Sequence, residues 1–452
     1  MTKDITKDMT SGSPTRHIFA FAVPMLLGMM FQQLYNMVDS MIVGKLLGPE
    51  ALAAVGSTGS INFLVLGFCM GITSGFAIPV AHHFGAKDYK EMRRCVGTGI
   101  WLSVIAAFSV SLLTSLLCRR ILEIMRTPED IIDAAHSYIF FIFAGIPATI
   151  LYNMVSGVIR SLGDSRTPVV FLIFSSISNI FLDIFFISIM KTGVEGAAYA
   201  TVIAQILSGV LCLVYVVKKF EILKMTRDEL LYNPRVAKKL LGMGIPMGLQ
   251  YSVTAIGSTV LQTFLNQLGT TAVAAASAGQ KIVQLFVIPF DALGSTMATY
   301  CGQNVGAAKV DRLKKGVMSA GLIGSAYAVI SFAVIYKFSS YLLLMFLDAK
   351  ETGLIALGSE FLIIQAMFFI PLVYVNVLRF SIQGMGFSQF AIIAGVMEMF
   401  ARMLTGMLLV PSFGYRAACL GSPLAWIAAD AFLIPAVIHC VKRLNKMFGK
   451  ES

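Results

Sequence analysis

The chain has 452 residues, of which 57% are hydrophobic and only 13% are charged. Soluble domains usually carry about 25% charged residues, so a soluble globule of this size could not cover its surface with so few. The hydrophobic residues form continuous runs rather than alternating with polar ones, which predicts an all-α polytopic membrane protein. The same composition excludes disordered, collagen-like and disulfide-scaffold proteins.

Twelve apolar stretches follow one another along the chain, and each reaches or exceeds the roughly 20 residues that span a bilayer. They lie near 17–43, 51–81, 96–118, 131–156, 168–190, 194–217, 240–266, 272–300, 316–336, 353–378, 389–411 and 417–441. We therefore expect twelve transmembrane helices, of which the second and the eighth are long enough to tilt or protrude. Residues 1–16 are polar, which indicates a tail before the first helix rather than a cleavable signal peptide.

Lysine and arginine are unevenly divided between the two sides of the membrane that these helices define. The loops and tails on one side hold 25 of them, those on the other side hold 8, and Lys281 and Arg402 fall inside helices. By the positive-inside rule, both termini are cytoplasmic in a multi-pass protein of the cytoplasmic (inner) membrane. Because the basic residues lie in short segments between apolar runs, they indicate topology and not a nucleic-acid partner.

The longest charged segment, 218–239, contains seven basic residues and lies at the midpoint of the chain. We interpret it as a cytoplasmic linker between an N-terminal lobe of helices 1–6 (residues 1–217) and a C-terminal lobe of helices 7–12 (residues 240–452). An ordinary cytoplasmic loop is the alternative interpretation.

The two halves resemble each other in sequence. Val23-Pro24-Met25 corresponds to Ile245-Pro246-Met247, and Gly193 corresponds to Gly414. The offset between matching residues is nearly constant along the whole chain, which chance matches between common residues would not produce. Each half has an even number of predicted helices, so the halves are expected to be parallel repeats related by an axis along the membrane normal.

Motifs for nucleotide use and for enzyme chemistry are missing from the sequence. Gly-Lys occurs at 44–45 and 449–450, and neither pair is followed by Ser or Thr, so there is no phosphate-binding Walker A loop. No cytoplasmic segment is large enough for a nucleotide-binding domain, which excludes ATP-driven pumping by this chain alone. No metalloprotease or serine-hydrolase motif is present either, so we expect a protein that is not an enzyme and needs no cofactor.

Two carboxylates inside predicted helices are the most informative residues. A carboxylate at the bilayer centre costs about 2.5–3.5 kcal/mol on insertion scales, so it is usually kept for a function. Asp39 has Tyr35 one turn before it, and Asp183 has Asn179 one turn before it, on the same helix face. Two carboxylates with amide and hydroxyl oxygens suit a small hard cation, and they equally suit a proton. The alternatives are an interfacial position for Asp39 and a helix-linking role for Asp183. Further oxygen donors are expected from Asn153, Ser156 and Thr201.

The second half differs at the matching positions. Asp39 corresponds to Val260 or Leu261, and Asp183 corresponds to Gly406, so a cation site is expected in the first half only. Glu398 and Arg402, four residues apart, predict a structural ion pair. The second half instead has polar faces that either line a substrate cavity or hydrogen-bond between helices. They consist of Gln250, Thr254, Ser258 and Gln262 on helix 7, and Gln280, Gln284 and Asp291 on helix 8.

Three motifs resemble those of the multidrug and toxic compound extrusion (MATE) transporters, and the resemblance covers essentially the whole chain. They are Pro24…Asn36-Met37-Val38-Asp39-Ser40…Gly44, Gly85-Ala86-Lys87, and Arg160-Ser161-Leu162-Gly163-Asp164-Ser165-Arg166-Thr167-Pro168. The resemblance implies twelve helices in two six-helix lobes that form a V-shaped central cleft, with drug efflux driven by inward flow of Na⁺ or H⁺.

The same resemblance implies roles for individual residues. The family's first-lobe cation site maps onto Asp39, Tyr35, Asn153, Asn179, Asp183, Thr201 and Tyr138, and the proline that bends its first helix maps onto Pro24. One branch of the family also has a glutamate on helix 7 and an aspartate on helix 10. Here the corresponding regions offer Gln250 and Gln365, which favours a first-lobe site and leaves the choice between Na⁺ and H⁺ open.

The sequence thus predicts a monomeric cation-coupled antiporter that exports small amphiphilic, often cationic compounds, with Gln250, Gln280, Gln284 and Asp291 facing the substrate. The alternative is a lipid-linked oligosaccharide flippase of related architecture. A flippase would need a cationic cleft for a pyrophosphate, and the only basic residues predicted inside helices are Lys281 and Arg402. An intramembrane enzyme is the third class, and it lacks any supporting motif.

Overall fold

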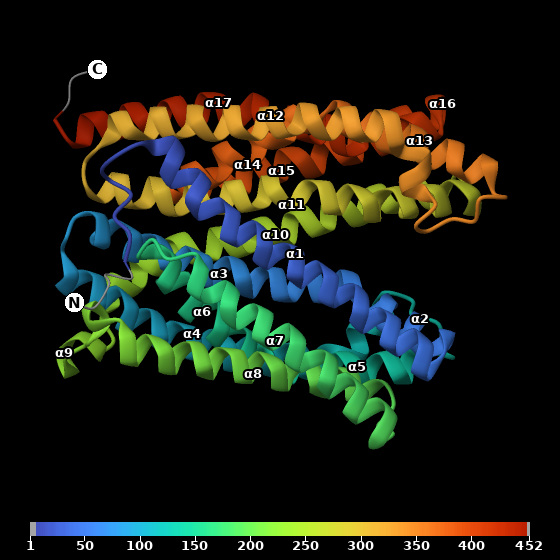
Figure 1. Cartoon of the computed structure of the whole chain (residues 1–452), viewed down its shortest axis with the longest axis horizontal. Coiled ribbons are helices and arrows are strands. Elements are labelled where there is room, and N and C mark those ends of the chain that lie inside the picture. The colour runs from blue at the N-terminus through green and yellow to red at the C-terminus, as the bar shows by residue number, and fades with distance from the viewer. Residues whose placement is uncertain (1–5, 450–452) are drawn as a thin grey trace. The chain divides into compact units, whose positions relative to one another are not determined.

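The computed structural model describes residues 6–449, and every regular element in that range is helical (Figure 1). The α-helices are α1 Pro14–Leu47, α2 Pro49–Ser57, α3 Gly59–Gly85, α4 Tyr89–Ile124, α5 Ile132–Ala144, α6 Ile146–Ser161, α7 Arg166–Ile184, α8 Val194–Lys219, α9 Arg227–Leu230, α10 Pro234–Asn266, α11 Thr270–Gly306, α12 Val310–Leu343, α13 Thr352–Met367, α14 Phe369–Gly384, α15 Ser388–Leu404, α16 Val410–Phe413 and α17 Tyr415–Met447. Two π-helical segments, η1 Phe185–Ile189 and η3 Thr405–Leu409, and one 3-10 helix, η2 Glu221–Leu223, complete the set.

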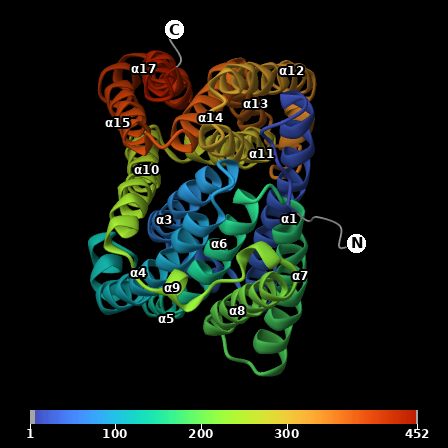
Figure 2. The same cartoon turned by 90° about the vertical axis from the view of Figure 1, so that its left-hand side faces the viewer.

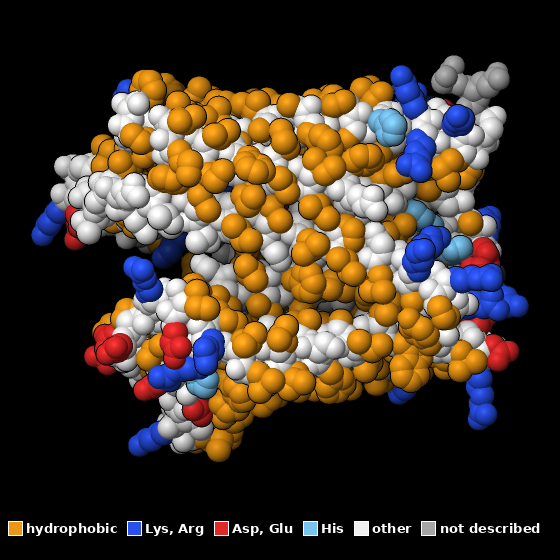
Figure 3. All heavy atoms as spheres, turned by 180° about the vertical axis from the view of Figure 1, so that it is seen from behind, with side chains coloured by type: hydrophobic (Ala, Val, Ile, Leu, Met, Phe, Trp, Pro, Cys, Tyr) orange, Lys and Arg blue, Asp and Glu red, His pale blue; other side chains and the backbone are white. Residues whose placement is uncertain are grey.

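Each of the twelve predicted apolar stretches lies on one helix or on consecutive helices. Within residues 6–449, nine helices are long and apolar enough to cross a membrane by themselves. Two further spans are bent pairs, α5 with α6 at 43° and α13 with α14 at 49°, whereas the sequence predicts each of them as a single helix. The 33-residue α10 accounts for the twelfth stretch. On the face shown in Figure 3, charged side chains gather at the two ends and hydrophobic side chains cover the surface between them.

The chain divides into two compact units by its contacts. Unit 1 comprises residues 1–8 and 27–248, and unit 2 comprises residues 9–26 and 249–452. Two of the three divisions fall inside a long helix, within a few residues of Pro24 in α1 and of Pro246 in α10, and the third precedes α1. The predicted lobes, 1–217 and 240–452 with the linker 218–239, are a division by helix number and stay a prediction beside these contact-based units.

The backbone repeats between the two halves in step with the sequence. Gly193 and Gly414, which match in the sequence repeat, both adopt positive φ, at 67° and 60°. Lys87 and Ala308, each of which follows a Gly-Ala pair, are in the left-handed region at φ 58° and 53°, which is uncommon for residues other than glycine. The π-helical segments η1 and η3 directly follow corresponding helices, α7 and α15. The repeat therefore extends to irregular backbone positions that residue identity alone does not preserve.

Close helix packing in unit 1 depends on the small residues of α3. A Cβ atom added to Gly71 would lie 2.5 Å from the carbonyl oxygen of Met247 on α10, so no larger residue fits without moving the backbone. Gly75 faces the backbone of Gly244 in the same way, one turn further along both helices. This is the small-residue packing that brings membrane helices together where hydrophobic burial does not drive association.

The segment after α8 is structured and bound to the end of α4. In Figure 2, which views the structure from one end, the yellow-green chain that carries α9 crosses this end of unit 1. A capping box starts α9, with Thr226 as the capping residue and Glu229 as its reciprocal partner. The segment predicted as a charged linker is therefore ordered by specific hydrogen bonds.

Candidate cation site

The two predicted carboxylates come together in unit 1. Asp39 lies on α1 and is partly buried, whereas Asp183 lies near the end of α7 and is fully buried. Their side chains are within hydrogen-bonding reach of each other. Two carboxyl groups can form such a bond only when one of them carries a proton, because two carboxylate oxygens both accept. Each residue also has one oxygen, Oδ1, with no protein partner.

Residues from α7 and α8 surround this pair with further oxygen atoms. We orient the Asn179 amide so that its nitrogen donates to Asp183 Oδ2 at 3.0 Å and its oxygen accepts from the backbone amide of Thr201 at 3.1 Å. The hydroxyl groups of Thr201 and Tyr35 lie close to each other. The geometry brings four of the predicted residues, on three helices, to one place around Asp39.

Tyr138 on α5 completes the described surroundings of the pair. Its side chain is buried, and it lies close enough to Asp39 and Asp183 to interact with their charges. A phenol beside the carboxyl pair can donate a hydrogen bond to a carboxylate that has lost its proton. The site therefore combines two acids with neutral hydroxyl and amide groups, and no described Lys or Arg forms an ion pair with either acid.

This arrangement is chemically suited to one small cation. Carboxylate, amide and hydroxyl oxygens are the ligands that hard cations prefer, and Asp39 Oδ1 and Asp183 Oδ1 are free to coordinate one. The same two acids can hold a single proton between them, because one negative charge in a low-dielectric site costs less than two. Both options give the pair an occupied state that carries less negative charge than its empty state.

Asn153 and Ser156, also predicted for this region, are not tied to the acids by any hydrogen bond in residues 6–449. The amide of Asn153 donates to Thr149 O of its own helix α6 at 2.8 Å, and the side chain is partly buried. Ser156 is fully buried and its hydroxyl has no partner. Pro24 lies inside the continuous helix α1. The structure thus assembles Tyr35, Asp39, Tyr138, Asn179, Asp183 and Thr201, whereas the Asn153 side chain bonds within its own helix.

The residues of the two polar faces predicted in the second half differ in burial. Gln250 on α10 is buried, and its Oε1 accepts a hydrogen bond of 2.6 Å from Gln383 Nε2 on α14, which is the interhelical alternative. On α11, in contrast, Gln280, Gln284 and Asp291 are all exposed and lie on one face. Ser258 and Gln262 of the α10 face are exposed as well, so a solute could reach these two residues and the α11 face but not Gln250.

A buried ion cluster in unit 2 is only half predicted by the sequence. The expected pair is confirmed, with Arg402 Nη2 at 3.2 Å from Glu398 Oε2. Arg379 on α14 pairs with the other oxygen of the same carboxylate, and the acids Asp291 and Asp430 are near enough to interact with its charge. The apolar stretch ends at residue 378 and so places Arg379 in a loop, whereas α14 continues to Gly384. The available signal was the helical spacing of Asn376, Arg379 and Gln383.

Comparison with known proteins identifies the family to which this chain belongs. The family model described as MatE matches residues 24–185 and again residues 246–408. The chain belongs to the MatE family. The two matches begin at the corresponding prolines, Pro24 and Pro246, so the family model itself recognises the internal repeat.

Individual relatives and solved structures agree with this membership. The chain is 30% identical over 363 residues, 78% of each protein, to "Probable multidrug resistance protein YoeA" of Bacillus subtilis (strain 168). It is 24% identical over 311 residues, 67% of this chain and 68% of the relative, to an "FAD transporter" of Shewanella oneidensis. The fold matches the structure described as "Outward-facing conformation of a multidrug resistance MATE family transporter of the MOP superfamily", with a TM-score of 0.91, 21% identity and coverage of 98% and 99%.

Membership confirms the main predictions from the sequence. The protein is a multi-pass membrane transporter of the MATE multidrug efflux family and is not an enzyme. Its all-helical, two-fold repeated architecture is the fold of that family.

Proposed function

We propose that this MATE transporter is an antiporter that exports small amphiphilic, often cationic compounds in exchange for inward movement of Na⁺ or H⁺. The observation that supports this is the Asp39–Asp183 pair, whose carboxyl groups adjoin each other inside unit 1. Intramembrane acids without a basic partner are costly unless they bind a cation or a proton in the working cycle. Asn179, Thr201, Tyr35 and Tyr138 complete the proposed binding site, and Asn153 supports it from α6.

The pair offers a physical route from cation occupancy to conformation. Empty, the two acids repel each other across the boundary between α1 and α7; occupied, they attract a shared ion. Pro24 lies in α1 about four turns before Asp39, and a proline inside a helix removes one backbone hydrogen bond and permits a bend. We propose that cation occupancy biases a bend of α1 at Pro24. Antiport then requires only that the cation and the exported compound favour different conformations.

The exposed face of α11 is the proposed substrate surface. Gln280, Gln284 and Asp291 offer amides for hydrogen bonding and one acid for a cationic group. Gln250 is buried against Gln383, so it would support this surface rather than touch a compound. We further propose that the protein works as a monomer in the inner membrane with both termini in the cytoplasm, on the basis of the basic-residue distribution.

The flippase alternative receives less support from the charges. A pyrophosphate would need unpaired cationic side chains, whereas Arg379 and Arg402 both pair with Glu398, and Asp430 and Asp291 are near enough to Arg379 to interact with its charge. One relative is named an FAD transporter, so a flavin dinucleotide belongs beside cationic dyes in any substrate panel.

Reconstituted proteoliposomes test the proposal directly. We expect a fluorescent amphiphilic cation to move against a Na⁺ gradient or a pH gradient imposed separately, and one of the two gradients to be sufficient. Asp291→Asn is the matched control for loss of an acid elsewhere, and it is expected to alter the compounds carried without changing the driving ion. Transport that needs neither gradient, or that depends on Asp291 and not on Asp39, would contradict the assignment.

A further inference from the structure

A cavity of about 400 Å³ lies in unit 1 between α4, α6 and α8, away from the cation site. Its wall includes Val96 and Phe108 of α4, Met154 of α6 and Val217 of α8. Ser103 and Lys224 are the only polar residues among those that line it. A cavity with so few polar groups does not hold ordered water, so its natural occupant is hydrocarbon.

The cavity opens towards the lipid-facing surface of unit 1. Its deep wall is buried, as at Met154, whereas its rim residues Phe108 and Val217 are each 66% exposed. Both rim residues belong to helices that are apolar enough to cross a membrane. The opening therefore faces the interior of the bilayer, where acyl chains are the solvent.

The length of the cavity corresponds to one leaflet. Val96 and Phe108 are twelve residues apart on α4, which is about 18 Å at roughly 1.5 Å of rise per residue. Half of a hydrocarbon core of about 30 Å is ~15 Å. A single acyl chain that enters from the bilayer and lies along α4 would therefore fill the cavity along its length.

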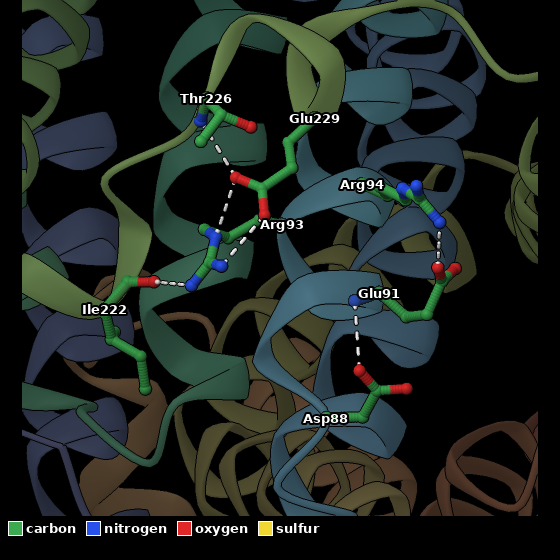
Figure 4. Close-up of polar contacts among 7 residues, drawn as sticks. All are labelled: Asp88, Glu91, Arg93, Arg94, Ile222, Thr226 and Glu229. Carbon is green, nitrogen blue, oxygen red and sulfur yellow. Dashed lines mark hydrogen bonds and ion pairs between the residues drawn. The ribbon is translucent and has the colours of Figure 1, made fainter.

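One end of the cavity is closed by the segment that follows α8. Phe220, Leu223, Met225 and Leu230 of this segment line the cavity. The segment is fixed in place because Arg93 of α4 donates to both carboxylate oxygens of Glu229, at 2.9 and 2.8 Å (Figure 4).

Two further hydrogen bonds hold the same closure. Thr226 N donates to Glu229 Oε2 at 2.8 Å, and Trp101 Nε1 donates to Leu230 O at 2.9 Å. The bonds from Arg93 and Thr226 lower the pKa of Glu229 to about 2, so this anchor is charged at neutral pH. The segment after α8 is therefore held in place by these hydrogen bonds and forms a fixed wall of the cavity.

The closed end also carries the positive charge. Lys224 lines the cavity there, is exposed, and among the described residues pairs only with the exposed Glu221 at 3.6 Å, a contact too weak to hold it. The segment 218–239 contains seven basic residues and three acidic ones. Clusters of Lys and Arg beside a membrane helix attract anionic lipid headgroups. The positive charge of Lys224 and the apolar wall together fit a molecule that has both an anionic group and a hydrocarbon chain.

We propose that this cavity binds one anionic glycerophospholipid, with an acyl chain between α4, α6 and α8 and the phosphate at Lys224. The site is separate from the proposed cation and substrate residues, so the inference does not depend on the transport mechanism. Ser103 lies in the cavity wall on α4, and its side chain is the natural position at which to close the space.

Native mass spectrometry of the delipidated protein in detergent tests the headgroup. We expect one palmitoyl-oleoyl phosphatidylglycerol to bind about fivefold more tightly than phosphatidylcholine with the same chains, the factor that ~1 kcal/mol per lysine represents. Lys224→Gln should remove this preference, whereas Lys238→Gln, an equal charge change at an exposed residue outside the cavity, should keep it. Equal behaviour of the two variants would overturn the proposal.

A second measurement tests the acyl chain, and its first part uses the wild-type protein alone. Phosphatidylglycerol with a photoreactive group on one acyl chain should crosslink the wild-type protein at α4, α6 and α8. Ser103→Phe, which places a ring in the path of the chain, should weaken these crosslinks, and Ser103→Ala, which leaves the cavity open, should retain them. Crosslinks elsewhere, or crosslinks that a transported cation displaces, would show that the cavity is not a lipid site.

Discussion

The two units share irregular backbone positions, but they differ in polarity at matching residues. In unit 1, Asp183 lies just before the π-helical segment η1 and adjoins Asp39. In unit 2, the matching Gly406 lies within the π-helical segment η3, and any side chain there would run into the ring of Phe264. Leu261, one of the two residues that can correspond to Asp39, packs against Gly421 in the same way. Unit 2 fills with apolar side chains the space that unit 1 leaves for oxygen atoms.

Nearer the middle of α6 and α14 the difference is the opposite one: unit 2 carries the charged residues and unit 1 does not. When these two helices are aligned at their first residues, Arg379 corresponds to Ser156, and unit 2 builds its buried ion cluster there. Unit 1 has only a serine hydroxyl without a partner at that position. A duplicated scaffold can therefore carry different charged sites, because the shared backbone constrains helix geometry and leaves each buried position free to be polar in one unit and packed in the other.

The largest effect is expected at the acids of unit 1. Asp39→Asn or Asp183→Asn should abolish gradient-driven export, to the level of vesicles without protein, because a neutral amide neither holds a proton nor attracts a cation strongly. The measurement is dye transport in proteoliposomes under separate Na⁺ and pH gradients. Elution as a folded monomer from a sizing column is the control, and full transport by either variant would remove the carboxyl pair from the mechanism.

A large effect on stability is expected at Glu398 in unit 2. Glu398→Gln leaves Arg379 and Arg402 buried without their shared carboxylate, and breaking a buried ion pair in this way costs about 3–5 kcal/mol. We expect a clearly lower unfolding temperature in detergent. Asp133→Asn, which breaks an ion pair with Arg119 at the surface, should leave that temperature almost unchanged. Equal shifts would mean that the buried cluster adds nothing to the packing of unit 2.

A smaller loss of stability tests the packing that replaces the acid. Gly406→Ala should destabilise unit 2 by about 1–3 kcal/mol, because the added methyl group meets the Phe264 ring in a filled core. Gly242→Ala on α10, which meets nothing within 4 Å, should instead be neutral or stabilising by up to ~1 kcal/mol. Thermal unfolding of both variants measures the contrast. A neutral Gly406→Ala would show that space for a second acid exists after all.

The sequence predicted the helices and the acid pair because both depend on local residue types. Apolar length marked the membrane stretches, and the helical spacing of Tyr35 with Asp39 and of Asn179 with Asp183 placed each pair on one face. It missed the breaks inside residues 131–156 and 353–378, although Pro147 and Pro371 stand just after them. A proline cannot continue the hydrogen bonding of a preceding turn, so the helix restarts there with a bend.

Arg379 and the burial of Gln250 could not be predicted in the same way. Both depend on which helix lies opposite: Glu398 of α15 for Arg379, and Gln383 of α14 for Gln250. Hydropathy reports the average polarity of a stretch and not which helix packs against it. A charged residue at the edge of an apolar run is therefore assigned to a loop. Tertiary pairing decides these positions.

The first two turns of α4 and α12 offer the last comparison between the units. Each contains an arginine that holds a segment outside the helix. In unit 1, Arg93 binds the carboxylate of Glu229. In unit 2, Arg312 donates to backbone carbonyls of the N-terminal segment, at 2.8 Å to Gly12 O and 3.0 Å to Met9 O. The carboxylate of Glu229 can be protonated at low pH, whereas the backbone carbonyls of Gly12 and Met9 cannot.

Acid should therefore release the segment of unit 1 and spare that of unit 2. The pKa of Glu229 is lowered from its ordinary value to about 2, so its stabilising contribution is fully present above about pH 4.5 and is lost as the pH falls towards 2. Limited pepsin digestion between pH 5 and pH 2 should show cleavage in 220–230 that increases through this window, while residues 9–12 stay protected. Glu229→Gln should make the same segment cleavable already at pH 5, because the amide cannot bind Arg93 as a charge. Cleavage of both segments together at low pH would show general acid unfolding and no difference between the two anchors.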